Sequence, residues 1–357
     1  MKKLYTYLLL GFVALPIAGF TGGMVTSEKA NAATKSKKKG SSANFYGRLW
    51  VQYSSEKAEG GQNNTAIFDD EGMGRVGVKG KSMIGNGYAV NYKVEYAIDL
   101  GDGDAAGTAG GTTEDHAFAL KQGWLGFLTP MGQFKFGSME SPYKYLAKHD
   151  ILHDTLAQMR DTKGISQGSM SHSSYWRGSA FYELKSGNFR FAAIKGMTNH
   201  TSDANMGNNK NDFGIGLEYK DLGIKGLSLV YAMNHDDSAD EENTKYTITY
   251  KTKLAGGQKV KVWYMHEDVE LDTKLFTTSG NGELDWYGIT YSSGPMKLMF
   301  STSDGEKDNS TEETDAYNLG LQYKLSKTSR LYAGYSDYEG DGFTDYRTYI
   351  VGLRHDF

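Results

Sequence analysis

The final segment of the chain, residues 346–357, alternates between two kinds of side chain. Tyr349, Val351, Leu353 and Phe357 fall on one face, whereas small or charged residues such as Arg354 lie between them. A period of two is that of a β-strand, whose successive side chains point to opposite faces of the sheet. The segment therefore predicts a sheet with one apolar face and one largely polar face.

The same alternation recurs along the chain, in segments joined by links that are short and long in turn. Sixteen strands are expected, near residues 44–53, 73–81, 88–100, 116–128, 133–139, 174–184, 189–198, 212–220, 226–234, 245–251, 259–264, 283–292, 296–303, 316–325, 330–338 and 345–357. Short turns on one side and long polar loops on the other are typical of a barrel that crosses a membrane. We therefore predict an all-β fold, a sixteen-stranded antiparallel transmembrane barrel. A β-sandwich would need a domain boundary and a solenoid a fixed repeat, and the sequence indicates neither.

The composition favours a barrel over a large water-soluble core. The chain contains 45 glycines and 25 tyrosines, has no cysteine, and is only 39% apolar. A membrane barrel shows apolar side chains on its outer face alone and keeps a polar interior, so its apolar content is low. Without disulfides, an exported fold of this kind relies on the closed hydrogen-bond network between its strands.

The N-terminal residues have the pattern of an export signal followed by a basic tail. Residues 1–33 begin with two lysines after the first methionine, continue with an apolar stretch over 8–20, and end in small residues, which predicts a cleaved signal peptide. Residues 34–43 are expected to form a basic periplasmic tail, and residues 44–357 the barrel. Removing the signal's net charge of +2 from the formal −4 leaves −6, which favours a weak preference for cations.

Four segments resemble the Gram-negative outer-membrane general porins: residues 45–49 (FYGRL), 74–80 (GRVGVKG), 123–127 (GWLGF) and the terminal strand that ends in Phe357. The resemblance implies a homotrimer in the outer membrane, in contact with lipid and lipopolysaccharide, through which small hydrophilic solutes and ions diffuse passively. It implies that the outer-membrane assembly machinery reads Phe357 as a signal. It also implies that the long third loop, about residues 140–173, folds into the pore. No cofactor, metal or nucleic acid is expected.

Two departures from the family pattern concern the expected constriction. The loop lacks the Pro-Glu-Phe-Gly-Gly type of segment common in these porins, and Gly137-Ser138 stands where the family has a glycine–arginine pair. The charged lining must therefore be derived from this chain's own residues.

Charged residues on the polar faces of the strands define a candidate pore lining. A cation that faces lipid at mid-membrane costs ~2–4 kcal/mol, so basic residues opposite the apolar stripe are expected to face the lumen. These are Arg48, Arg75, Lys79, Lys93, Lys135, Arg177 and Arg190. The third loop, with a helix expected over 145–159, offers the acidic residues Glu140, Asp150, Asp154 and Asp161. Opposed basic and acidic walls would set a transverse field across a narrow pore that filters solutes by size and charge.

The sequence leaves two alternative functions open. One is a substrate-specific outer-membrane channel, and the other is a surface adhesin or structural barrel with a plugged lumen. The chain contains no glycine-rich phosphate loop with a following Lys-Ser/Thr, which argues against a nucleotide-dependent enzyme. His149 and His153 have the spacing of metal ligands on a helix, but a polar helix face is the simpler interpretation.

Overall fold

The structure is a computed structural model that describes residues 41–58, 63–69, 74–98, 100, 118–159, 175–198, 210–237, 240–270, 281–341 and 345–357. Its elements are β1 (Ser42–Ala58), β2 (Asn63–Asp69), β3 (Gly74–Gly85), β4 (Tyr88–Ile98), β5 (Phe118–Thr129), β6 (Gly132–Glu140), α2 (Pro142–Leu146), β7 (Tyr175–Ser186), β8 (Phe189–Gly196), β9 (Phe213–Lys220), β10 (Leu227–Asp236), β11 (Glu241–Lys253), β12 (Lys259–Val269), β13 (Gly282–Ser293), β14 (Met296–Lys307), β15 (Glu313–Lys324), β16 (Ser329–Gly340) and β17 (Tyr346–Asp356).

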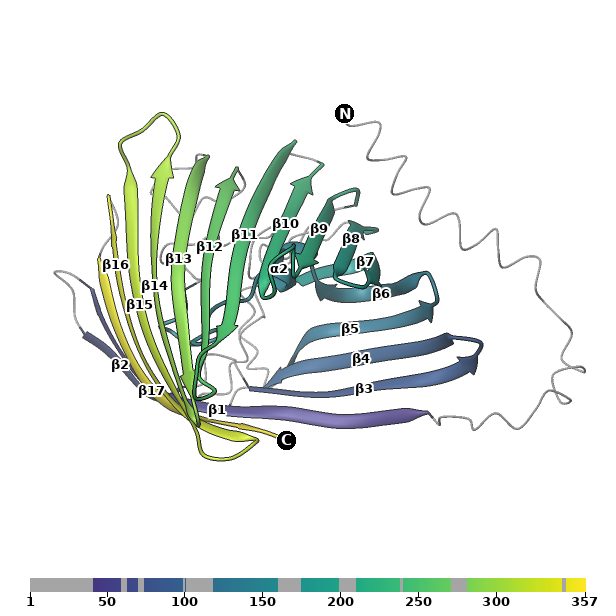
Figure 1. The fold of residues 1–357 in the computed structure, drawn as a ribbon, viewed down its shortest axis with the longest axis horizontal. Coiled ribbons are helices and arrows are strands. Elements are labelled where there is room, and N and C mark those ends of the chain that lie inside the picture. The colour runs from purple at the N-terminus through teal and green to yellow at the C-terminus, as the bar shows by residue number, and fades with distance from the viewer. Residues whose placement is uncertain are drawn as a thin grey trace, which may run out of the picture. The chain divides into compact units, whose positions relative to one another are not determined.

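The strands join into one closed antiparallel sheet in which neighbours in the chain pair with one another (Figure 1). The ring closes between the first and last strands, where residues 48–58 of β1 pair with residues 346–356 of β17. Beyond this register, the backbones of Gly47 and Phe357 exchange two hydrogen bonds of 3.0 and 3.1 Å. Closure joins the first strand to the last, so neither edge of the sheet stays open at this seam.

Two strands share one position in the wall. β2 pairs with residues 52–57 of β1, and β3 pairs with residues 42–48 of the same strand. The seventeen strands of the described residues therefore fill sixteen positions, and the predicted sixteen-stranded barrel is confirmed. The second wall position begins at β2, earlier than the expected 73–81. The sequence does not predict β2, because Asn63–Asp69 (NNTAIFD) has its two large apolar residues side by side and so shows no alternation.

Outward and inward side chains differ sharply in exposure. On β15, Leu319 is 54% exposed, whereas its neighbour Asn318 is 3% exposed. Large apolar residues such as Phe45, Leu125 and Phe300 are exposed on the outer surface, while many serines, threonines and asparagines are buried. An apolar outer face around a polar interior is the arrangement of a barrel surrounded by lipid.

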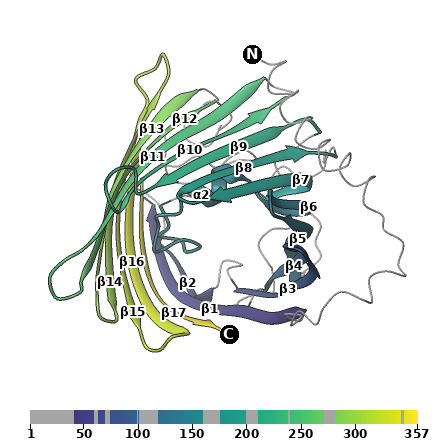
Figure 2. The same cartoon turned by 45° about the vertical axis from the view of Figure 1, so that its right-hand side comes forward.

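The described part of the third loop, residues 141–159, lies inside the ring of strands, as expected (Figure 2). Its apolar side chains form a buried cluster with inward-facing residues of β1, β12, β13, β14, β16 and β17. The loop thus follows the inner wall and does not project from the end of the barrel.

The helix of this loop is shorter and earlier than the sequence predicts. The expected helix over 145–159 is wrong, because α2 spans only the five residues Pro142–Leu146. Ser141 caps it by accepting a hydrogen bond from the Lys144 backbone N–H, and Pro142 provides the fixed φ that suits a first turn. After Leu146 the chain turns toward the wall, so tertiary packing outweighs helix propensity. No helix among the described residues is long and apolar enough to cross a membrane.

Candidate functional site inside the barrel

Two adjacent apolar residues anchor the third loop to the wall. Ile151 is 8% exposed and Leu152 is fully buried, both within the inner cluster. Glycines make room for them: a Cβ at Gly320 of β15 would lie 3.0 Å from Ile151, and one at Gly334 of β16 would lie 2.5 Å from Leu152. Gln322 fixes the same place, because its Nε2 donates a 2.6 Å hydrogen bond to the carbonyl oxygen of Ile151.

Asp150 shapes the loop backbone. Its Oδ1 accepts a hydrogen bond from the N–H of Leu152 at 2.7 Å, and its Oδ2 accepts one from the N–H of Met159 at 2.6 Å. Thr155 adds a 2.7 Å bond from its Oγ1 to the carbonyl oxygen of Leu152. Hydrogen bonds to a charged acceptor are the stronger kind, so this carboxylate ties the two ends of residues 150–159 together.

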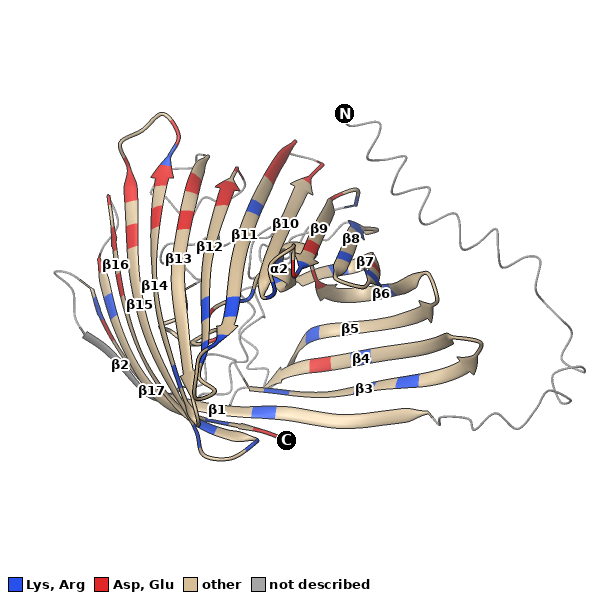
Figure 3. Ribbon diagram, in the orientation of Figure 1, with Lys and Arg blue, Asp and Glu red and all other residues tan. Residues whose placement is uncertain are grey.

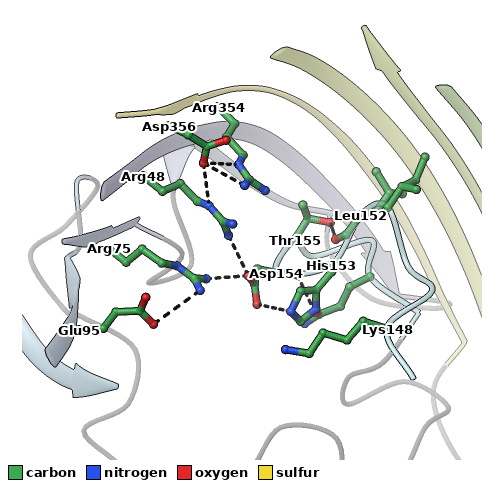
Figure 4. A network of polar contacts seen from close by, with 12 residues as sticks. Arg48, Arg75, Glu95, Lys148, Leu152, His153, Asp154, Thr155, Arg354 and Asp356 are labelled. Atoms are coloured by element: carbon green, nitrogen blue, oxygen red, sulfur yellow. Dashed lines mark hydrogen bonds and ion pairs between the residues drawn. The ribbon is translucent and has the colours of Figure 1, made fainter. Parts of the chain in front are cut away.

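Asp154 reaches the basic wall directly (Figure 4). Its Oδ2 lies 3.2 Å from Nη1 of Arg48 and 2.7 Å from Nη2 of Arg75. Its Oδ1 lies 3.1 Å from Nε2 of His153. Asp154 has a φ of +68°, a left-handed conformation in which aspartate is enriched. The acidic loop and the basic wall, expected to oppose each other across a pore, are therefore in contact at this point.

A second carboxylate extends the network toward the closing strand. Asp356 of β17 lies 3.3 Å from Nε of Arg48, 2.9 Å from Nη2 of Arg354 and 2.5 Å from Nη2 of Arg330. One carboxylate thus faces three guanidinium groups from β1, β16 and β17. The arrangement leaves a surplus of positive charge on this part of the inner wall.

A third carboxylate, Glu95 of β4, extends the network on the other side. It lies 3.9 Å from Nη1 of Arg75 and 3.1 Å from Nζ of Lys93, and it accepts a 2.8 Å hydrogen bond from the hydroxyl of Tyr46. Lys79 lies with its Nζ 4.7 Å from the centroid of the Tyr46 ring. Four of the predicted residues, Arg48, Arg75, Lys93 and Asp154, therefore belong to one connected group.

A separate charged group lies beside α2. Arg190 has its Nη2 2.6 Å from Oε1 of Glu183 and its Nη1 3.5 Å from Oε2 of Glu218. Tyr145 of α2 donates a 3.0 Å hydrogen bond to Glu183. Burial and the adjacent carboxylate raise the pKa of Tyr145, so its hydroxyl stays protonated and continues to donate.

A buried ion pair lies under the same helix. Nζ of Lys245 on β11 and Oε1 of Glu267 on β12 are 3.8 Å apart, and both side chains are fully buried. The ring of Tyr143, from α2, covers the lysine with its centroid 4.1 Å from Nζ. Removing one of two oppositely charged groups from such a buried pair is strongly destabilising. Because Tyr143 of α2 covers Lys245, we expect the ion pair and the helix to depend on each other.

His149 meets the wall at another lysine. Its ring stacks on Trp263 at a centroid distance of 5.3 Å, and its Nδ1 lies 3.1 Å from Nζ of Lys261. An ammonium group can only donate, so Nδ1 accepts. Burial, and then the charge of Lys261, hold the pKa of His149 well below its ordinary value, which keeps the ring neutral. No group of three or more potential metal ligands occurs in the described part of the chain.

The two other basic candidates lie on β6 and β7. Lys135 has its Nζ 4.4 Å from the ring centroid of Phe181 and 5.1 Å from that of Trp124. Arg177 is half-buried on β7 beside Gly178, whose φ of +54° accompanies a shift in strand register. Lys135 therefore rests on aromatic rings of β5 and β7.

The remaining acidic candidates differ from Asp154 in their surroundings. Glu140, the last residue of β6, lies 2.7 Å from Nζ of Lys148. Asp161 lies outside the described residues. Of the predicted loop acids with a described position, Asp154 is therefore the one that meets Arg48 and Arg75.

The sequence prediction misses several charged residues of this region, including Arg330 and Arg354, which lie on Asp356. Alternation could have found Glu95 and Asp356, since they share an inward face with Lys93 and Arg354 respectively. Lys121 interacts electrostatically with the same network, but it lies where the register between β4 and β5 shifts. A bulge of this kind breaks the period of two, so counting along the strand cannot place Lys121.

A sequence model of the Gram-negative porin family matches residues 20–342 of the chain. No curated protein sequence matches it. Similar solved structures include OmpF of Salmonella typhi in complex with daunomycin, with a TM-score of 0.67, 13% identity, and coverage of 89% of this chain and 98% of that one.

Two further structures show the same likeness. The anion-selective porin from Comamonas acidovorans has a TM-score of 0.62 and 16% identity, with coverage of 89% of this chain and 99% of that one. OmpT of Vibrio cholerae, in its trimer form, has a TM-score of 0.60 and 15% identity, with coverage of 89% and 100%. At such identities the structures show a shared fold. The family match over most of the sequence establishes that the chain belongs to the Gram-negative porin family and is a channel of the outer membrane.

Proposed function

We propose that this chain is a general diffusion porin, in which the third loop filters small hydrophilic solutes and ions by size and charge. The observation that carries this proposal is the course of the loop. Near its start it lies against β9, where a Cβ at Gly216 would meet Leu146 at 2.3 Å, and further along it reaches the ion pairs of Asp154 with β1 and β3. A chain segment along so much of the inner wall reduces the open cross-section of the barrel.

Passage through such a channel is passive, and the chain carries out no catalysis. The groups around Asp154, Asp356 and Glu95 place several charges of both signs on the inner wall. Fixed charges close to a narrow water-filled passage favour some ions over others without binding them tightly. Size is then selected by the loop, and charge by the residues on which the loop rests.

Several features of the proposed porin extend beyond the channel itself. We propose a homotrimer in contact with lipid and lipopolysaccharide, an arrangement for which the trimer form of Vibrio cholerae OmpT is a precedent of the same fold. Residues 1–33 are removed as a signal peptide and residues 34–43 form a basic periplasmic tail. The outer-membrane assembly machinery recognises Phe357.

Planar-bilayer recording of the purified, folded protein tests this function. Stepwise openings in groups of three are expected, together with liposome swelling that slows as neutral sugars grow larger. Folded protein that conducts no current would refute the channel function. Current block by one solute at low concentration would instead favour a substrate-specific channel.

A further inference from the structure

One wall of the lumen carries a row of lysines, of which the third loop contacts one, Lys261, through His149. We name as the lysine track Lys251 of β11, Lys259 and Lys261 of β12, Lys297 of β14 and Lys324 of β15. Each lies next to an outward-facing residue of its strand, such as Tyr250, Val262, Leu298 or Tyr323, and therefore points inward. Their strand ends are joined by the short links 254–258, 294–295 and 325–328, so the track lies at the short-turn end of the barrel.

The pairing register places these charges opposite one another. Lys251 pairs directly with Lys261, and Lys324 pairs directly with Arg330, which in turn pairs with Arg354. Like charges directly opposite each other on one face of a sheet are destabilising. Asp356 bridges Arg330 and Arg354. Among the described residues, no carboxylate bridges Lys251 to Lys261 or Lys324 to Arg330, so these two pairs weaken the wall that carries them and are difficult to explain as a structural device.

The remaining members of the track bridge the gaps in this row. Lys259 and Lys297 both pair with Ser292 of β13, one from each side, so they are two strand spacings, or roughly 10 Å, apart. Lys297 pairs with Gln322, two residues before Lys324, and such diagonal neighbours are within reach of long side chains. Flexible ammonium groups at these spacings can converge on one small solute.

Carboxylates balance the arginines of this row but not its lysines. Among the described residues, none pairs with Lys251, Lys259, Lys297 or Lys324, and Lys261 contacts the neutral ring of His149. Lys251, Lys259 and Lys324 are exposed to solvent, and the other two lysines are half-buried. The ammonium groups of the track are therefore accessible from the water of the lumen.

The acidic residues of the same strands gather at the other end of the barrel. Figure 3 shows blue bands toward one end of β11 and β12 and red bands toward the opposite end of β13, β14 and β15. There Asp285 pairs with Asp304, and Asp304 pairs with Asp315, in register with the outward-facing Tyr287 and Tyr317. The negative net charge of the chain therefore does not describe its lumen, and the cation preference expected from it does not follow.

We infer that the lysine track binds small multivalent anions, that is, compact solutes with several phosphate or carboxylate groups, at the periplasmic mouth of the channel. The short-turn end of an outer-membrane barrel faces the periplasm. A multivalent anion would relieve the repulsion between the paired cations, and the positive field would concentrate it near the mouth. This inference rests on the proposed function, because the anion must share an open water-filled lumen with the permeating ions.

Current block by inorganic tripolyphosphate tests the inference. Added to one side of a bilayer that contains the wild-type channel, tripolyphosphate should reduce the potassium chloride current from the short-turn side and far less from the other. The double variant Lys251→Gln and Lys297→Gln should be blocked roughly fivefold less, as expected for the loss of two charge contacts of modest strength. Glutamine keeps most of the side-chain stem and removes a repulsion, so the variant is expected to fold.

A matched control separates the track from general charge. Lys225 and Lys327 lie exposed in the links 221–226 and 325–328 at the same end of the barrel. Their double change to glutamine alters the net charge equally and should leave the block unchanged. Equal loss of block in both double variants, or equal block from both sides of the wild-type channel, would overturn the lysine track as a binding site.

Calorimetric titration of tripolyphosphate into the folded protein in detergent gives a readout that does not need conduction. Wild-type protein should bind, and the Lys251→Gln, Lys297→Gln variant should bind roughly fivefold more weakly. Binding without channel openings would refute the diffusion function and leave the anion site standing. Channel openings without binding would refute the anion site and leave the diffusion function standing.

Discussion

Nη2 of Arg75 lies 2.7 Å from Oδ2 of Asp154, so a residue of the inner wall and a residue of the third loop form a direct ion pair. Both side chains are mostly shielded from solvent, at 16% and 17% exposure. Screening by salt is weaker for shielded pairs than for exposed ones. The charge of the wall and the position of the loop are therefore coupled.

Asp154→Asn should shift ion selectivity toward anions. The change removes a negative charge between Arg48 and Arg75 and keeps the size of the side chain. Loss of charged hydrogen bonds should also weaken loop attachment by about 1–3 kcal/mol. The reversal potential in a potassium chloride gradient measures the shift, and the exposed Asp308→Asn serves as control. An unchanged reversal potential in Asp154→Asn would place this residue outside the ion path.

Gly334→Ala should increase single-channel conductance and current noise. The new Cβ would lie 2.5 Å from Leu152 and 3.0 Å from Ile350, so the loop must move off the wall. Overpacking of this kind costs about 1–3 kcal/mol. Gly123→Ala is a suitable control, because its Cβ would meet its nearest neighbour, Leu120, at an ordinary 3.5 Å. Identical conductance traces for the two variants would argue against glycine-dependent loop anchoring.

Lys245→Met should destabilise the barrel by about 3–5 kcal/mol, because it leaves Glu267 charged and buried. The double variant Lys245→Met, Glu267→Leu removes both charges and should recover most of that loss. Heat- or denaturant-induced unfolding in detergent, followed by circular dichroism, measures both variants. If the double variant is as unstable as the single one, the loss of stability does not come from an uncompensated charge on Glu267.

Acidic pH should loosen the third loop through His149. Its pKa in the folded protein is lowered, so below the ordinary value of about 6.5 the undocked state binds more protons than the docked one. Docking therefore loses stability as pH falls below that value. Single-channel noise should rise between pH 7.5 and pH 5 in the wild type, and less so in His149→Asn. An equal rise in single-channel noise in the wild type and in His149→Asn would show that groups other than His149 cause the pH response.

Removal of Phe357 should reduce the amount of protein in the outer membrane more than it changes conductance. The Phe357 ring lies 5.8 Å from that of Phe45 and covers Gly47, on the outer side of the barrel and away from the lumen. Phe300→Ala is the matched control, since both phenylalanines are 47% exposed. Comparable membrane levels of the two variants would contradict a special role for the terminal residue.

The strands could be predicted from the sequence because lipid on one side and water on the other impose a strict period of two. That rule places Arg48, Lys93 and Arg190 on the polar face without further information. It fails at Lys121, where a bulge shifts the register. Local irregularities of this kind depend on the neighbouring strand and leave no clear mark in the sequence.

The third loop was predictable in position but not in structure. Its length and its acidic residues indicate a functional loop, yet its path follows from contacts between residues far apart in the chain. Leu152 is held by Gly334, and Asp154 by Arg75, and neither pair is visible to a local pattern. The same contacts end the helix after Leu146, where propensity alone would extend it.

The third loop rests on both ends of the chain at once. Asp154 pairs with Arg48 on the first strand, and the buried cluster around Leu152 includes Ile350 on the last one. Until those two strands meet, part of the surface that receives the loop does not exist. For the proposed porin, the loop can therefore take up its filtering position only after the first and last strands have paired.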